Sequence, residues 1–378
     1  MGVIYLDNAA TNRYVPQAAM SAYVRAVNRK ANPGRAAHRD AAWLGLEVYR
    51  VRQQILSFVG AQHAEVVFTK NCTEALNLGI LGFLREGHVV TTCTEHNSVL
   101  RPLYALEREN KVRLSVVQPK RPEVGVGVEE VAAALRPDTR LVVVNHASNV
   151  TGIANDVAAI GAYLSERSVP FMVDGAQSAG HLPLHMGRMG IDMLAMPAHK
   201  GLHGLCGVGC LVLNRRLRLS PLTYGGTGTH SETLLPPVEY PESMEAGTLD
   251  APAILAFGKA LSWTEAHLGE LWEREEKLIE RAKRGLGEIE GVRLYGGGCG
   301  ILSFSLSNLD STAVADRLDE RGIAVRAGLH CAPLMHRYLA TQKKGLVRIS
   351  VGYVNTSSHI DRLVEEVKRL AQGSSLRE

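Results

Sequence analysis

The sequence has no hydrophobic run long enough to cross a membrane, which requires about 20 consecutive apolar residues. Residues 1–7 have neither the cationic stretch nor the apolar core of a secretory signal, so we expect no such leader. The net charge is only +4, from 42 Lys and Arg against 38 Asp and Glu, and no basic block is interleaved with aromatic residues. Nucleic acid is therefore a poor candidate for a partner, whereas small acidic ligands fit the slight basicity.

The cysteines are too scattered to indicate a disulfide framework or a zinc site. They stand at positions 72, 93, 206, 210, 299 and 331, and none forms a Cys-x-x-Cys pair. We therefore expect no metal and a reducing, cytoplasmic location. Cys206 and Cys210 are predicted to lie in a glycine-rich turn and to have no role as ligands. No Gly-x-Gly-x-x-Gly motif stands between a strand and a helix, so nothing predicts a dinucleotide-binding fold.

Two regions of different character make up the chain. From about residue 40 to 215, strand-like runs alternate with helix-like stretches, which predicts an α/β fold with a mostly parallel, doubly wound sheet. A Gly-, Pro- and Thr-rich stretch over 224–250 follows, then a long helix to about residue 289 and three short strands. We predict a large domain over 16–256 and a smaller α+β domain over 257–378, with residues 1–15 packing against the smaller one.

Lys200 and Asp174 both follow strand-like runs, where ligands of open α/β sheets bind. The strand-like run 192–196, which is apolar after Asp192, precedes Lys200, and the run 170–173 precedes Asp174. An ammonium at the end of a buried strand is costly unless it is neutralised or bonded covalently, and a Schiff base supplies such a bond. A carboxylate there suits the ring nitrogen of pyridoxal phosphate. A salt bridge at the sheet rim is the alternative for either residue alone, but together they favour a pyridoxal phosphate enzyme.

Three further segments at predicted strand ends suit the same cofactor. Residues 71–75 start a helix directly after a strand, so the Thr73 hydroxyl and the backbone amides, including that of Cys72, can bind a phosphate. His96 can lie flat on a heteroaromatic ring. Asn149 can hydrogen-bond a cofactor hydroxyl or a substrate carboxylate. The plainer alternatives are a helix cap, a surface histidine and a turn asparagine.

These residues belong to a series of motifs that resembles the class V aminotransferase-like enzymes, specifically the cysteine desulfurases and selenocysteine lyases. Each motif alone is weak, but their order along nearly the whole chain is specific. They are YLDNAAT at 5–11, NPGR at 32–35, TEALN at 73–77, EH at 95–96, NVTG at 149–152, DGAQ at 174–177, HK at 199–200, EAGT at 245–248, RAGLHCA at 326–332 and VRIS at 347–350. The resemblance implies the type I fold of pyridoxal-phosphate-dependent transferases. The His-Cys-Ala segment resembles the group with a short, ordered cysteine loop, which feeds iron–sulfur assembly through a partner.

The resemblance also implies how the cofactor is held. Lys200 would bind it covalently, Asp174 would pair with the pyridine nitrogen, Gln177 would meet the ring hydroxyl and His96 would stack on the ring.

Its phosphate would be held by Thr73 and His199, helped by Thr248 from the other subunit of a homodimer. Relatives usually have Ser or Thr where this chain has Pro197, so one phosphate contact is missing or replaced.

The substrate carboxylate would be bound by Arg348 with the help of Asn149, because a guanidinium suits a bidentate contact. Cys331 then decides between reactions, since aminotransferases, lyases and desulfurases share a lysine base, but only desulfuration requires an attacking thiolate. A thiol beside His330 and near Arg326 can be partly ionised, attack the substrate sulfur and leave alanine plus an enzyme persulfide. A buried structural cysteine is the alternative.

We predict a cytoplasmic, homodimeric, pyridoxal-phosphate-dependent cysteine desulfurase with no membrane partner. Selenocysteine lyase is the first alternative, because a selenol is already ionised and leaves readily. Another class V lyase or aminotransferase is the second, and the intact lysine and aspartate speak against a non-catalytic scaffold. The sequence leaves open which molecule accepts the sulfur, including whether it is an acceptor protein.

Overall fold

The computed structural model describes residues 2–29, 31–33, 38–229 and 232–373 of the chain. Gly34 and Arg35 of the predicted motif at 32–35 lie outside the described residues. In the described part, no helix is both long and apolar enough to cross a membrane.

A seven-stranded sheet forms the centre of the larger half within the described residues. Its order is β2 (Ala64–Thr69), β8 (Gly209–Asn214), β7 (Met193–Pro197), β6 (Phe171–Asp174), β5 (Thr139–Asn145), β3 (Gly87–Thr92) and β4 (Val112–Val117). All neighbouring strands are parallel except β8, which runs antiparallel to both β2 and β7. The predicted mostly parallel sheet is therefore confirmed.

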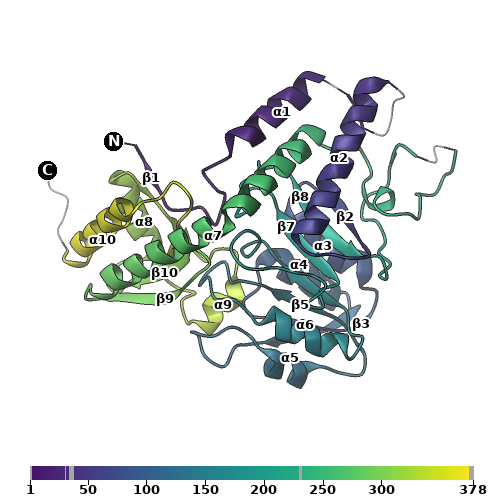
Figure 1. Cartoon of the computed structure of the whole chain (residues 1–378). Helices are drawn as coiled ribbons and strands as arrows, with labels where there is room; N and C mark the ends of the chain where they lie inside the picture. The colour runs from purple at the N-terminus through teal and green to yellow at the C-terminus, as the bar shows by residue number, and fades with distance from the viewer. Residues whose placement is uncertain (1, 30, 34–37, 230–231, 374–378) are drawn as a thin grey trace.

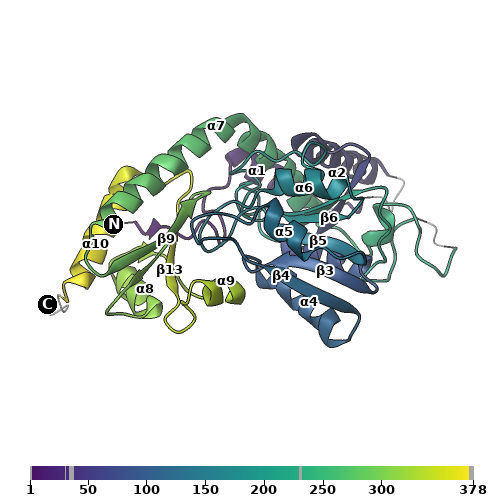
Figure 2. The same cartoon turned by 90° about the horizontal axis from the view of Figure 1, so that it is seen from below.

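Helices cover both faces of this sheet (Figures 1 and 2). They are α2 (Arg39–Phe58), α3 (Cys72–Phe83), α4 (Asn97–Arg108), α5 (Val128–Ala134) and α6 (Val157–Ser165), while α1 (Gln17–Arg29) packs against the long helix Ala251–Gly287. Along β7, Leu194 and Met196 belong to one apolar core, while Met193 and Ala195 belong to the core on the opposite face. Because both faces are covered, the central strands carry apolar residues at consecutive positions rather than at alternate ones.

The smaller half contains an antiparallel sheet in the order β12 (Arg326–Gly328), β13 (Leu346–Ser350), β10 (Ile301–Leu306) and β9 (Val292–Gly298). Strand β1 (Ile4–Tyr5) pairs in parallel with β11 (Ile323–Ala324), so the start of the chain lies in this half. The helices here are α8 (Ser311–Glu320), α9 (Pro333–Tyr338) and α10 (Ser357–Ala371).

One long helix, α7 (Ala251–Gly287), connects the two halves, and a short 3-10 turn at Glu242–Met244 precedes it. Its first turns place Ile254 and Phe257 in a core of the large sheet, and its last turns place Leu278 and Leu286 in the core of the small one. Figure 2 shows the helix passing from one half to the other. The predicted boundary between residues 256 and 257 falls inside this helix, and the division into two domains stays a prediction.

One prediction about the cysteines was wrong. Cys210 does not lie in a turn, because Gly209–Asn214 forms the interior strand β8, in which Cys210 is fully buried. Burial raises the pKa of this thiol to about 12, which leaves it inert. Cys206, in the turn before the strand, is exposed.

Candidate active site

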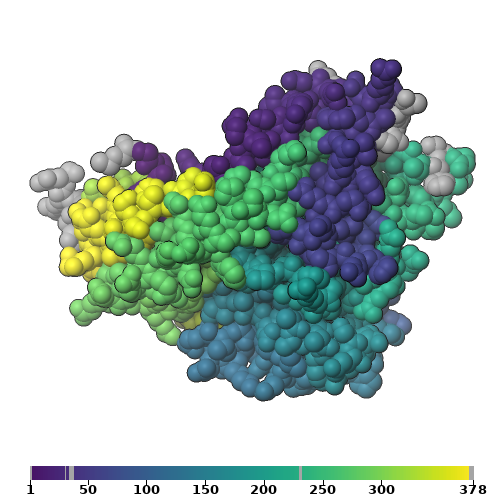
Figure 3. Space-filling model, in the orientation of Figure 1, coloured from purple at the N-terminus to yellow at the C-terminus, as the bar shows by residue number. Residues whose placement is uncertain are grey.

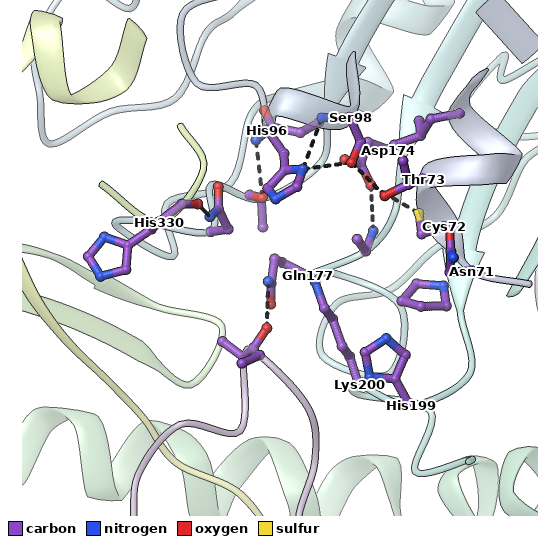
Figure 4. Close-up of a pocket in the computed structure, with 18 of the residues that line it drawn as sticks. Asn71, Cys72, Thr73, His96, Ser98, Asp174, Gln177, His199, Lys200 and His330 are labelled. Atoms are coloured by element: carbon purple, nitrogen blue, oxygen red, sulfur yellow. Dashed lines mark hydrogen bonds between the residues drawn. The ribbon is translucent and has the colours of Figure 1, made fainter. Parts of the chain in front are cut away.

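A cavity of about 230 Å³ lies at the carboxyl ends of the large-sheet strands, facing the small half. Ten of its lining residues are labelled in Figure 4. The predicted residues that line it are Cys72, Thr73, His96, Asn149, Asp174, Gln177, His199, Lys200 and Arg348. Segments up to about 340 residues apart in the sequence therefore meet where the parallel strands end, as the topology of open α/β sheets requires.

Lys200 lies three residues beyond β7, in a tight turn that brings it into the cavity. His203 N–H donates to the Lys200 carbonyl at 2.9 Å, and Gly204 N–H donates to Ala198 at 2.8 Å, which closes the turn. Burial lowers the pKa of Lys200, while the nearby Cys72 and Asp174 oppose this change. A lysine with a lowered pKa is more readily available as a free amine, the form that attacks a carbonyl carbon.

Asp174 is the last residue of β6, and its carboxylate is 4 % exposed. Oδ1 accepts the backbone N–H of Ala176 at 2.9 Å and the thiol of Cys72 at 3.7 Å. Burial raises the pKa of Asp174, whereas the Ala176 amide, the charge of Lys200 and the Cys72 thiol favour its ionised form. A positively charged ring nitrogen would stabilise the carboxylate further.

The amino terminus of α3 forms the wall opposite Lys200. Asn71 caps the helix through the N–H of Glu74 at 2.9 Å, and Thr73 follows with its hydroxyl 2.7 Å from that of Ser98. The free amides of a helix start and these hydroxyls suit an anion. His199 adds an imidazole, which lies 3.1 Å from the Thr11 hydroxyl. Burial and the charge of Lys200 lower the pKa of His199 to about 4.

His96 caps α4, and its geometry determines where the ring proton sits. Nδ1 accepts the backbone N–H of Ser98 at 3.0 Å, so the proton of the neutral ring is on Nε2. Burial, with the charge of Lys200, lowers the pKa of His96 to about 4, and the ring is therefore neutral at pH 7. A neutral imidazole is suited to stacking on an aromatic ring.

Gln177 and Asn149 reach the cavity from the loops after β6 and β5. Gln177 Nε2 donates to the Ala9 carbonyl at 3.0 Å, and Asn149 Nδ2 donates to the His330 carbonyl at 2.6 Å. The Oδ1 atom of Asn149 is buried and has no hydrogen-bond partner among the described residues.

Arg348 comes from the middle of β13, on the small-half side of the cavity. It donates to Asp7 Oδ1 at 2.8 Å and to the Asn149 carbonyl at 2.9 Å, while its Nε has no partner in the described part of the chain. Arg326 is its cross-strand neighbour and also lines the cavity. Two guanidinium groups therefore face the same space, which suits a carboxylate ligand.

Cys331 does not line the cavity but directly follows His330, which does. The thiol is exposed, and the backbone of both residues is left-handed, with φ of 49° at His330 and 57° at Cys331. Asn97 N–H donates to the Cys331 carbonyl at 2.7 Å, which joins this turn to α4. The turn is therefore fixed at the edge of the cavity despite a backbone conformation that non-glycine residues rarely adopt.

The imidazole of His330 packs away from the cavity. Its Nδ1 lies 3.3 Å from His336 Nε2, and His336 in turn contacts the Thr341 hydroxyl at 2.8 Å. Figure 4 shows the His330 ring pointing away from Lys200 and Asp174. Burial and Arg348 lower the pKa of His330 to about 3, so this ring contributes no positive charge beside Cys331 at pH 7. The cations nearby are the two arginines.

Thr248 lies apart from this cavity, exposed in the segment that leads into α7. Glu245 anchors the segment, because both of its carboxylate oxygens bind the Arg52 guanidinium, at 2.8 and 2.6 Å. The stretch that precedes this segment, which contains Leu234, Leu235 and Val238, protrudes from the body of the molecule at the right of Figures 1 and 3.

Several wall residues are absent from the sequence-based prediction, notably Ser98, Asn145 and Arg326. Ser98 stands two residues after His96 and its hydroxyl contacts both His96 and Thr73, at 2.8 and 2.7 Å. Its place two residues after a histidine at a strand end is a signal that could have identified it. Pro197 also lines the cavity, and it offers neither a hydroxyl nor an N–H.

Comparison with known proteins agrees with this geometry. Residues 4–363 match the family model of the class V aminotransferases. A probable cysteine desulfurase of Methanothermobacter thermautotrophicus is 35% identical over 97% of this chain and 94% of its own length. The cysteine desulfurase IscS of Escherichia coli is 31% identical over 97% of this chain and 92% of its own. The apo structure of a cysteine desulfurase from Thermococcus onnurineus superposes with a TM-score of 0.89 at 30% identity, covering 98% of this chain and 95% of that one. The chain belongs to the class V aminotransferase family and, within it, to the cysteine desulfurases.

Proposed function

We propose that this enzyme uses pyridoxal phosphate to remove sulfur from L-cysteine, giving L-alanine and a persulfide on Cys331. The observation that carries the proposal is the convergence of Lys200 and Asp174 in one buried cavity, with an exposed thiol at its edge. When bound, pyridoxal phosphate withdraws electrons from the substrate and so makes its Cα proton acidic.

The residues present fit this cofactor. Lys200 would hold it covalently, Asp174 would bind the ring nitrogen, Gln177 the ring hydroxyl, and the neutral His96 would lie against the ring. A buried carboxylate with a raised pKa gains from a cationic partner, which supports the role of Asp174.

The phosphate would sit at the start of α3, bound by the amides of Cys72 and Thr73, the Thr73 hydroxyl and His199. Pro197 cannot contribute the hydroxyl that relatives have at this position. We assign the missing contact to Ser98, whose hydroxyl lies 2.7 Å from that of Thr73 and lines the same cavity.

The substrate would bind Arg348 through its carboxylate, with Asn149 beside it. Both have a buried polar atom without a partner in the described residues, Nε and Oδ1 respectively, and such atoms are costly unless something pairs with them. Nε can donate to the carboxylate, and Oδ1 can accept from the amino group. The Lys200 amine would take the Cα proton.

Cys331 would attack the substrate sulfur as a thiolate. The new S–S bond forms as the substrate Cβ–S bond breaks, and the electron pair of that bond passes to the substrate carbon skeleton. Protonation of this skeleton then yields alanine. Exposure of the thiol supports the next step, because a persulfide must be reached by the molecule that accepts its outer sulfur.

The active form would be a homodimer in which Thr248 of one subunit reaches the phosphate of the other. Leu234, Leu235 and Val238 in the protruding segment are 103%, 79% and 77% exposed, and such an apolar surface favours a partner. Light scattering at assay concentration tests this assignment, because a fully active monomer would contradict it.

The acceptor of the sulfur would be a thiol compound or an acceptor protein in a reducing cytoplasm, where the free cysteines at all six positions are stable.

One experiment tests the function. Purified holoenzyme is incubated separately with cysteine and with selenocysteine, and alanine is quantified from each. We expect alanine from cysteine together with one added sulfur on the peptide that contains Cys331. Alanine from selenocysteine alone would favour the lyase instead, and no alanine from either would contradict both.

A further inference from the structure

Cys72 is a thiol inside the cavity for which the reaction above has no use beyond its backbone amide. It is the first residue of α3, and its side chain is 9% exposed. A Cβ on Gly209 would lie only 2.9 Å from the Cys72 backbone nitrogen, so the missing side chain there lets β8 press against this turn. The backbone at Cys72 is therefore held in place by β8 packed against it.

The thiol contacts one oxygen of Asp174 only. Cys72 Sγ and Ala176 N–H both bind Oδ1, at 3.7 and 2.9 Å, and no hydrogen bond ends on Oδ2 in the described part of the chain. Figure 4 shows the sulfur of Cys72 directed at the Asp174 carboxylate. With Oδ1 held twice, the second oxygen remains for a ligand in the cavity.

The proton of this pair stays on sulfur. Burial and the neighbouring Asp174 raise the pKa of Cys72 well above its ordinary value, while Lys200 opposes this only in part. A thiol that keeps its proton is a hydrogen-bond donor and a poor nucleophile. Cys72 is thus the opposite of Cys331, although both thiols lie near the same cavity.

We propose that Cys72 is a positioning residue, whose thiol donates to Oδ1 of Asp174 and so fixes the carboxylate with Oδ2 free for the cofactor's ring nitrogen. The inference rests on the proposed function and adds to it a residue that acts through Asp174. Loss of the donor leaves Asp174 with the single contact from Ala176, and a carboxylate held at one point can rotate away from the ring.

The test compares Cys72→Ala, which removes the donor, with Cys72→Ser, which keeps one. Two properties of the holoenzyme are measured: the dissociation constant of pyridoxal phosphate and the pH midpoint of the change in its visible absorbance. We expect Cys72→Ala to weaken cofactor binding by about 5- to 10-fold, the range for one ordinary hydrogen bond, because a thiol is a weak donor, and to move the absorbance midpoint. Cys72→Ser should restore both.

Cys93→Ala is the matched control, because Cys93 is equally small and buried but does not line the cavity. It should change neither property. In an Asp174→Asn background, Cys72→Ala should have no further effect on the absorbance midpoint. A wild-type midpoint in Cys72→Ala, or a folded Cys72→Ser that behaves like Cys72→Ala, overturns the inference. If the wild type itself bound no pyridoxal phosphate, the proposed function would fail instead.

Discussion

The two sides of the cavity differ in how they hold their reactive groups. On the large-sheet side, Asp174 ends a buried strand and Lys200 follows one, so their positions come from a packed core. On the small-sheet side, Cys331 stands in a left-handed turn that is tied to its surroundings by individual hydrogen bonds.

This difference matches the chemistry proposed for each side. A group that binds a cofactor and moves a proton benefits from a dry site, where burial changes its pKa, as it does for Asp174 and Lys200. A group that passes an atom to another molecule must be reached from outside, and the Cys331 thiol is exposed. Substitutions on either side of the cavity test this comparison.

The largest effect is expected from Lys200→Ala on the buried side. Without the amine, borohydride should no longer fix pyridoxal phosphate to the protein, and alanine formation should fall by more than about 10³-fold, as for loss of an acid–base group. Mass spectrometry of the reduced wild type should find the pyridoxyl group on Lys200. Its attachment to another lysine would show that the assignment is wrong.

On the exposed side, Cys331→Ser should leave cofactor binding and its absorbance unchanged. Alanine formation from cysteine should fall by roughly 10²- to 10³-fold, because a hydroxyl is a far poorer nucleophile toward sulfur. Cys206→Ser is the control, since Cys206 is also exposed but does not line the cavity. An active Cys331→Ser variant with the added sulfur on Cys206 would contradict the mechanism.

Arg348→Lys tests the junction of the two sides. An ammonium cannot keep the contacts to Asp7 and Asn149 while also binding a carboxylate. KM for cysteine should rise by about 10-fold or more, the range for losing a hydrogen bond to a charged group, while cofactor affinity stays unchanged. Arg281→Lys, in an exposed ion pair with Asp361, is the control. An unchanged KM would remove Arg348 from the substrate site.

The smallest effect concerns Glu95, a buried carboxyl group behind the cavity. Burial raises its pKa from 4.5 to about 8, so the folded protein keeps a proton there that the unfolded chain loses above about 4.5. Its contribution to stability is therefore complete below pH 4.5 and lost as the pH rises toward 8.

Glu95→Gln removes this titration and should flatten the pH dependence of stability. Between pH 5 and 8.5, the free energy of unfolding of the wild type should fall by about 4 kcal/mol more than that of the variant. Urea titrations at several pH values measure this difference, and Glu320→Gln, at an exposed position on α8, is the control. Identical slopes in wild type and Glu95→Gln would show that Glu95 is ionised in the folded state.

The sequence predicts the large sheet and most of its helices because buried parallel strands are long apolar runs. It does not predict β4, whose residues Arg113 to Val117 are only partly buried at the edge of the sheet, so its pattern is less distinct. The glycines near Cys210 predict a turn, but Cys210 belongs to β8, which lies between β2 and β7 in the sheet.

In the site, Lys200 and Asp174 could be predicted because a charged residue after an apolar strand is unusual. Arg326 could not be placed in the cavity, since an arginine in a short strand is an ordinary feature and only the fold brings it there. The neutral state of His330 also depends on burial and on Arg348, which lies 18 positions further along the chain.

The helix α7 has a consequence for how the molecule unfolds. Its 37 residues span about 55 Å at 1.5 Å per residue and contribute side chains to the cores of both halves. Glu275, on the same helix, also binds His181 at 2.8 Å, and His181 packs against Gly201, the neighbour of Lys200. Unfolding of either half would remove contacts that hold α7 in place. The other half would then lose the side chains that α7 contributes to its core. The two halves should therefore unfold in one cooperative transition, and the reactive lysine should lose its geometry in that same step rather than before it.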